Sequence, residues 1–207
     1  MECLKILENQ EPMLRTEYIK QTNEIVLSVM GKIQLEVLQE ILSTRFGISA
    51  TFEKPEVQYR ETVAKTVIGY GHYEPLRHYA EVVLEIAPAE RNSGITFDST
   101  VHIDVLSANY QALVKTHIFE KQHKGILTGS PLTDVKITLI NGRAHLKHTE
   151  GGDFRQATYR AIRQGLEKAE NVILEPFYAF EIYAGEEYAG RIMTDIQRLR
   201  GSFEPPV

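Results

Sequence analysis

Histidines and tyrosines gather in two glycine-bearing stretches of the sequence, 69–78 and 143–152, and these are the residues that could do chemistry. Four of the seven histidines lie there, namely His72, His78, His145 and His148. The same stretches carry further aromatic and cationic side chains, namely Tyr70, Tyr73, Arg77, Arg143 and Lys147. Cations beside aromatic rings on glycine-permitted backbone suit the binding of phosphates and unstacked bases. The alternative is a pair of solvated loops that bind nothing.

Signatures of the common enzyme classes are absent from the sequence. It contains no GxxxxGKS or GxxxxGKT phosphate-binding loop and no GxSxG, HExxH or CxxC motif. His145 and His148 are spaced as some pairs of metal ligands are. They are not in a predicted helix, however, and no carboxylate stands at a ligand spacing from them, so we expect no metal site. We also expect no catalytic residue in this chain. An acid–base pair of His148 and Asp153, as in a histidine-based hydrolase, stays open as an alternative.

The composition is that of a globular protein, with 43% hydrophobic and 25% charged side chains among 207 residues. The lone cysteine, Cys3, excludes a disulfide framework and favours a reducing compartment. The sequence contains no run of about 18 apolar residues, so we expect no membrane-spanning helix. Residues 1–10 are unlike a secretory signal. We therefore expect a cytoplasmic protein without a membrane partner.

The net charge of −5 is distributed unevenly along the chain. Residues 1–54 carry −2, residues 55–172 are neutral and residues 173–207 carry −3. Within the neutral part, residues 115–168 hold ten basic and five acidic side chains, a net of +5. Because local potential governs the encounter with an anionic partner, the overall acidity does not exclude a nucleic acid.

Periodicity and turn signals predict which elements hold the two stretches. In residues 1–54 they predict a helix end at 1–7, strands at 13–19 and 24–30 around a turn at 21–23, a helix between Gly31 and Gly47, and a strand at 48–52. This α-β-β-α-β order is that of a split β-α-β, ferredoxin-like domain that lacks its first strand. We therefore expect a fragment of a longer chain.

Residues 55–172 are expected to form a β-β-β-α-β-α domain. Strands are predicted at 59–68, 79–87, 95–103 and 134–140, and helices at 108–123 and 154–169. The two polar stretches are then loops at strand ends, with a tight turn at Asn141-Gly142 and with Asp153 as the N-cap of the last helix. On that helix Arg155, Tyr159 and Arg163 fall side by side.

Residues 173–207 are expected to hold a strand at 173–183 and a helix at 187–200 capped by Gly201. One strand and one helix cannot bury their own apolar faces, so this is the truncated start of a further domain. The fold class predicted for the whole chain is α+β, with domains at 1–54, 55–172 and 173–207.

Three stretches of the sequence carry a resemblance to a known family. They are GKIQLEVLQEIL with FEKPEVQYRET at 31–62, GSPLTDVKITLINGRAHLKHTEGGDF at 129–154, and VILEPFYAFEIYAGEEYAGRIMTDIQRLRG at 172–201. Together they resemble the C-terminal half of elongation factor G and of its relatives, the tetracycline-resistance ribosomal-protection proteins. The resemblance implies most of a third domain, a whole fourth domain of the ribosomal protein S5 domain 2-like fold, and the start of a second ferredoxin-like domain. The GTPase domain, with its GTP and Mg²⁺, would lie upstream.

The resemblance also implies a partner, the ribosome. The tip of the fourth domain in such factors reaches the decoding region of the small subunit, and His145 falls where elongation factor G carries a tip histidine. The residues then expected to contact ribosomal RNA are Tyr70, His72, Tyr73, Arg77, His78, His145, Lys147, His148 and Thr149, supported by Arg155 and Arg163. The parent protein would be either a resistance-like ribosomal-protection protein or an ordinary translocation factor.

Overall fold

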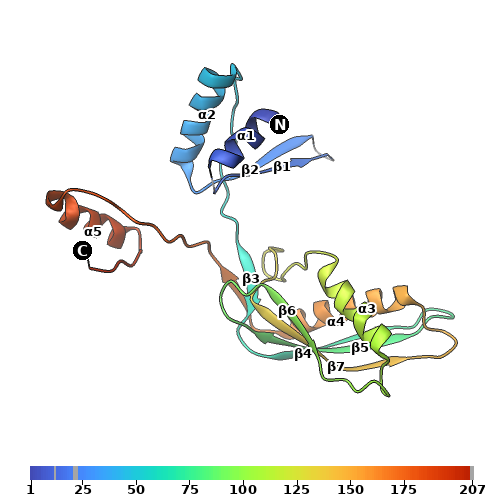
Figure 1. The fold of residues 1–207 in the computed structure, drawn as a ribbon. Helices are drawn as coiled ribbons and strands as arrows, with labels where there is room; N and C mark the ends of the chain where they lie inside the picture. Colours follow the sequence, from blue (N-terminus) through green and yellow to red (C-terminus); the bar gives the residue numbers. More distant parts are fainter. Residues whose placement is uncertain (12, 21–22, 206–207) are drawn as a thin grey trace.

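The structure, a computed structural model, describes residues 1–11, 13–20 and 23–205. Its first part contains α1 (Glu2–Gln10), β1 (Arg15–Ile19), β2 (Glu24–Ser28) and α2 (Lys32–Phe46) (Figure 1). The two strands pair antiparallel, and Leu7, Leu14 and Leu38 are buried in a small core. Gly47 ends α2 in the left-handed conformation at φ 65°, as its position predicted. Two residues of the predicted turn, 21–22, lie outside the described residues.

The strand predicted at 48–52 does not form. Its apolar side chains, Ala50 and Phe52, pack against the core formed by α1, α2 and Leu14. The Gln39 side-chain amide donates to the carbonyl oxygen of Ala50 at 3.0 Å. A strand requires a neighbouring ladder of backbone hydrogen bonds, and none of the described residues supplies one here.

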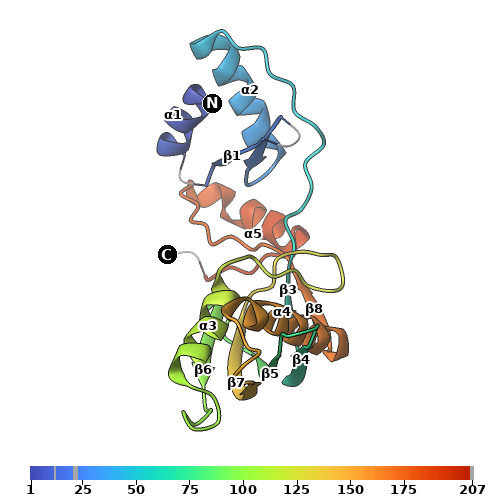
Figure 2. The same ribbon diagram turned by 90° about the vertical axis from the view of Figure 1, so that its right-hand side faces the viewer.

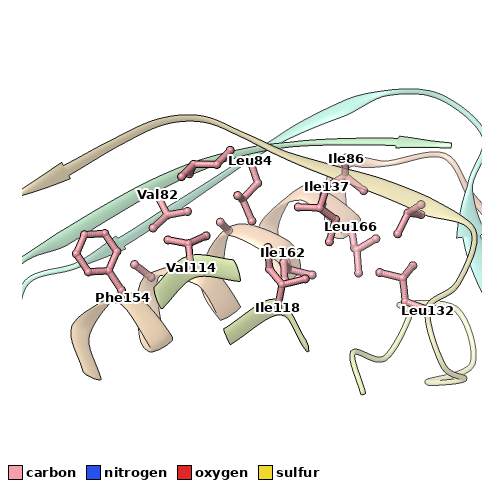
Figure 3. Packing of buried hydrophobic residues seen from close by; sticks show 14 of the residues in the cluster. Val82, Leu84, Ile86, Val114, Ile118, Leu132, Ile137, Phe154, Ile162 and Leu166 are labelled. Carbon is pink, nitrogen blue, oxygen red and sulfur yellow. The ribbon is translucent and has the colours of Figure 1, made fainter. Parts of the chain in front are cut away.

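The middle part is a four-stranded sheet covered on one face by two helices (Figures 1, 2 and 3). Its strands lie in the order β4 (Val67–Tyr73), β5 (Ala80–Pro88), β7 (Val135–Ala144) and β6 (Ile95–Ser99). Only β6 and β7 run parallel; the other pairs are antiparallel. The covering helices are α3 (Ala108–Phe119) and α4 (Gly151–Lys168). A separate two-stranded antiparallel sheet is formed by β3 (Arg60–Val63) and β8 (Asn171–Leu174). The expected α+β class is confirmed.

The core of this part lies between the sheet and the helices (Figure 3). Val82, Leu84 and Ile86 alternate along β5 and are fully buried, as the period of a strand requires. Ile162 and Leu166 of α4 face them. Each such side chain contributes about 2 kcal/mol through burial. This core holds α4 against the sheet and so fixes the loop that precedes it.

Two glycines allow α4 to lie unusually close to β4. A Cβ on Gly69 would overlap the carbonyl oxygen of Ala161, and a Cβ on Gly71 would overlap that of Ala157. Gly165 meets Gly69 from the helix side. The Gly69-x-Gly71 pair therefore serves helix packing, and it brings the side chains of α4 within reach of the strand edge.

Several features of the middle part differ from the sequence predictions. The strand predicted at 59–68 is two strands, β3 and β4, which belong to different sheets, and the strand predicted at 95–103 ends at Ser99. Asn141 and Gly142 form no turn but lie inside β7, next to a bulge at which Val83 pairs with Asn141 while Leu84 pairs with Leu139. A Cβ on Gly142 would lie 2.8 Å from the Leu106 side chain, so a glycine at this position makes room for Leu106.

Two further differences concern the polar stretches themselves. Tyr70, His72 and Tyr73 belong to β4 and not to a loop. The helix starts at Gly151, three residues earlier than predicted, with Glu150 as its N-cap and Asp153 in the third helical position of a capping box. Asp153 is therefore not the N-cap.

After β8 the chain runs without strand partners from 175 to 185. The predicted strand at 173–183 is observed only to Leu174, because Leu174 pairs with Arg60, the first residue of its partner β3. A short 3₁₀ turn, η1 (Glu186–Tyr188), leads into α5 (Ala189–Arg198). At the end of α5 it is Arg200, at φ 59°, and not Gly201 that takes the left-handed conformation.

Candidate nucleic-acid interface

Two loops meet at the end of the sheet away from β3 and β8 (Figure 1). They are the β4–β5 loop, 74–79, and the β7–α4 loop, 145–150. Tyr73, Ala80 and Ala144 lie in register on the three strands, so the loops start side by side. We call residues 72–81 and 143–153 the tip.

Four rings of the tip follow one another in contact. His72 meets Tyr79 edge-on at 5.7 Å between centroids, and Tyr79 meets His145 edge-on at 6.5 Å. His145 and His148 are stacked at 4.5 Å with 23° between their planes. The row thus joins both polar stretches through Tyr79. The His145 Nδ1 accepts the backbone N–H of Lys147 at 3.3 Å, so this nitrogen is engaged within its own loop.

A threonine fastens the two loops together. The Thr149 hydroxyl donates to the carbonyl oxygen of Tyr79 at 2.6 Å and accepts the backbone N–H of His145 at 2.7 Å. The backbone N–H groups of His148 and Thr149 both donate to the His145 carbonyl at 3.1 Å. Thr149 was predicted as an RNA contact, but its hydroxyl is engaged in hydrogen bonds that hold the ring row in place.

Asp153 fixes a second histidine of the tip. Its carboxylate is 3% exposed and lies 2.8 Å from Nδ1 of His78. The other carboxylate oxygen accepts the backbone N–H of Glu150 at 2.8 Å. The acid–base pair considered for His148 and Asp153 is not formed, because Asp153 is engaged by His78. His72 lies between Glu74 and Glu81, at 2.9 Å and 3.2 Å.

The tip is not basic in its fixed charges. Its residues hold three Lys or Arg and four Asp or Glu, so with neutral histidines its formal charge is −1. The cations of the basic stretch lie mainly along the helix layer, where 108–124 and 151–168 together hold seven Lys or Arg and three Asp or Glu. Lys147, Arg77, Leu76 and Leu146 project into solvent, the two leucines almost completely.

The two arginines expected to support the tip are committed to partners inside the domain. Arg155 donates twice to Glu120, at 2.9 Å and 3.2 Å, and Tyr159 donates to the same carboxylate. The Tyr159 hydroxyl, followed by Arg155, lowers the pKa of Glu120 to about 2. Arg163 pairs with Glu167 at 2.8 Å. This side of α4 therefore joins α4 to α3.

The side of α4 next to β4 carries cations that the sequence analysis did not single out. The Arg160 guanidinium lies 5.1 Å from the Tyr73 ring centre, and it donates to the His72 carbonyl at 2.8 Å. The Lys168 ammonium lies 5.5 Å from the Tyr70 ring centre. Positions 160, 164 and 168 are successively four residues apart and so lie along one side of the helix, and this spacing was the signal that could have found the two cations. Tyr70 thus belongs to this side and not to the ring row.

Among residues 1–11, 13–20 and 23–205, no three His, Cys, Asp or Glu side chains gather as metal ligands. Within the same ranges no helix is long and apolar enough to cross a membrane.

Residues 1–54 match the family model of elongation factor G domain III, and residues 55–170 match that of elongation factor G domain IV. The chain belongs to the elongation factor G family. It is 32% identical over 202 residues to an elongation factor G-like protein of Thermotoga maritima, in a match that covers 96% of this chain and 30% of that protein. A crystal structure of a Thermus thermophilus protein matches it with a TM-score of 0.73 at 30% identity, again over 96% of this chain and 30% of the other.

The family resemblance seen in the sequence is thereby confirmed, and the chain spans about 30% of the length of the relatives it matches. The domain IV match includes the whole tip and both sides of α4. The β3–β8 pair runs to Leu174, past the boundary we placed at 172 and the end of the match at 170.

Proposed function

We propose that this chain carries domain IV of a ribosome-binding translational GTPase to the decoding region of the small subunit. The observation that supports this most is the row of four rings from His72 to His148 at the free end of a domain IV fold. Aromatic and imidazole rings bind unpaired bases by stacking, and RNA loops offer such bases. The role is thus argued from the site as well as from the family.

The roles of the tip residues follow from their contacts. His148 is stacked on one face by His145, so its other face offers a platform for a base. Lys147, an exposed residue of the same loop, would bind a phosphate. Thr149 and Asp153 act as positioning residues, since their polar atoms are engaged within the tip.

GTP and Mg²⁺ would act in a separate, upstream domain of the same protein, which would be a direct partner of this chain. The sequence here has no phosphate-binding loop to hold them. In this proposal the chain itself is not catalytic. It works in the cytoplasm, where it transmits the state of the GTPase domain to ribosomal RNA.

Two functions fit such a tip, and we favour ribosomal protection. In that role the tip displaces tetracycline or remodels its pocket, and the stretches at 129–154 and 172–201 resemble the ribosomal-protection proteins as well as elongation factor G. The second candidate, translocation of tRNA, is favoured by the match to an elongation factor G-like protein. Translation by purified ribosomes in rising tetracycline, with and without the full-length protein, separates the two functions.

Ribosome binding is tested with His145→Ala combined with Lys147→Ala in the full-length protein. We expect weaker binding to ribosomes and loss of chemical protection of decoding-region RNA. Lys115→Ala, on α3 and outside both tip loops, is the control for lost charge. Unchanged affinity and an unchanged footprint in the double variant would show that the tip does not contact RNA.

A further inference from the structure

One flank of domain IV bears two cations that no carboxylate of the described residues neutralises. The flank strip consists of Arg160, Gln164 and Lys168 of α4 with Tyr70 and Tyr73 of β4. We propose that the strip binds the sugar–phosphate backbone of an RNA strand and so extends the contact of the tip along the domain. This inference rests on the proposed function, because it takes the RNA to be held at the tip.

The charges of the strip are available to a partner. Among the described residues neither Arg160 nor Lys168 forms an ion pair. The other two arginines of α4, Arg155 and Arg163, are paired with Glu120 and Glu167. One side of the helix is thus neutralised internally, and the other presents two positive charges on exposed side chains.

The strip is also held in a defined geometry. Each cation lies near the ring of a tyrosine, Lys168 at Tyr70 and Arg160 at Tyr73, which restricts these long side chains before any partner arrives. Gln164 accepts the backbone N–H of Tyr70 at 2.8 Å. The close approach of α4 to β4 over Gly69 and Gly71 makes these contacts possible. Less side-chain freedom is then lost on binding.

Contacts along the β4 edge argue against a peptide as the occupant. A peptide that added a strand would need the free N–H and C=O groups of β4, the outermost strand of its sheet. The Tyr70 N–H is taken by Gln164, and the His72 carbonyl is taken by Arg160. Two of the backbone groups that a peptide would need are thus engaged, and the side chains beside them are an exposed tyrosine, 55% accessible, and two cations. This chemistry fits a polyanion that also bears stackable bases.

The spacing of the strip suits a chain of phosphates. Arg160, Gln164 and Lys168 are four residues apart, which places successive side chains about 6 Å apart along the helix axis. The Arg160 end adjoins the ring row, since Arg160 binds the backbone of His72, the first residue of that row. A single RNA strand could therefore run from the tip to the middle of the flank.

The test uses two double variants of the full-length protein that each remove two positive charges from α4, one pair next to β4 and the other pair engaged in ion pairs. Arg160→Gln with Lys168→Gln removes the strip, and Arg155→Gln with Arg163→Gln is the matched control. Dissociation constants are measured for vacant small ribosomal subunits and for a labelled oligouridylate of about 12 nucleotides, a length within the usual single-strand site sizes, at low and at moderate KCl. We expect the strip variant to bind both about tenfold more weakly, and its log–log salt slope to fall by about 1.5, as loss of two phosphate contacts implies.

Further variants keep a folding defect apart from a binding defect. Lys168→Gln alone removes an exposed side chain whose main contact is the Tyr70 ring, so its melting temperature should match that of the parent. Arg160→Lys keeps the charge and should retain most of the binding. If the strip variant matches its control in affinity and slope, while the His145 and Lys147 variant is weakened, the strip inference is wrong and the proposed function stands.

The remaining outcomes are equally decisive. If neither the strip variant nor the tip variant is weakened, the proposed function fails together with the strip. If the strip variant loses affinity for the subunit but not for oligouridylate, the flank binds an acidic protein surface and the RNA inference is overturned.

Discussion

The hydroxyl of Thr149 and the carbonyl oxygen of Tyr79 lie 2.6 Å apart, and this one hydrogen bond joins the two loops of the tip. The same hydroxyl also accepts the His145 N–H. Thr149, which carries no ring or charge, thus sets the positions of the rings in the histidine-rich loop.

Thr149→Val is therefore expected to loosen the arrangement of the ring row, although all four of its rings are retained. It removes two hydrogen bonds at a half-buried position, which costs about 1–2 kcal/mol of stability. Affinity for ribosomes should fall although His145, Lys147 and His148 are all retained. Urea unfolding and ribosome binding measure the two effects. Thr149→Ser, which keeps the hydroxyl, should behave as the parent, and equal losses in both variants would contradict the positioning role.

The buried carboxylate of Glu61 gives a second prediction, on acid stability. Burial raises the pKa of Glu61, but the backbone N–H groups of Leu127, Thr128 and Ser130 and the Thr128 hydroxyl donate to it, so its pKa falls below the ordinary 4.5. The ionised form then stabilises the fold above pH 4.5. That contribution is lost as the pH falls from 4.5 through the folded pKa.

Glu61→Gln should lower the free energy of unfolding by about 2–3 kcal/mol at neutral pH, because an amide accepts fewer of these hydrogen bonds and charged acceptors are the stronger ones. The deficit relative to the parent should shrink as the pH falls below 4.5. Urea titrations at neutral pH and on either side of this value measure it. A deficit that stays constant over this range would mean that the carboxylate charge contributes nothing.

The contact between α4 and β4 gives a third prediction. Gly71→Ala places a methyl group against the backbone of Ala157, which cannot move aside as a flexible side chain would. We expect a loss of about 3 kcal/mol in unfolding free energy. Gly152→Ala in the first turn of α4 meets nothing within 4 Å and should be neutral or slightly stabilising. Thermal melts of both variants make the comparison, and similar melting temperatures would exclude the close-packing role of Gly71.

Local signals predicted the elements whose ends are decided locally. The helix α2 begins after Gly31 and ends at Gly47, because a left-handed cap depends on one residue. The strand at 48–52 failed for the opposite reason, since a strand depends on a partner that can lie far away in sequence. Asn141-Gly142 is a strong turn pair by itself, yet both residues continue β7 because β5 pairs with the strand on either side of them.

The candidate site was predictable in its residue types but not in their division of labour. The rings of the two stretches are joined through Tyr79, because β4, β5 and β7 are neighbours. Which arginines of α4 are free of ion pairs could not be read from the helix alone. That depends on Glu120, the C-cap of α3, which engages Arg155, and on β4, whose tyrosines lie near Arg160 and Lys168.

The double engagement of Asp153, with His78 on one loop and Glu150 on the other, bears on the entropy of association. A loop that is disordered when free must give up conformational entropy on docking, and part of the contact energy is lost to that ordering. Here both loops are tied to the first turn of α4 before any partner arrives. Binding should therefore need little rearrangement, and the heat-capacity change on complex formation should reflect the buried interface alone, without a folding contribution.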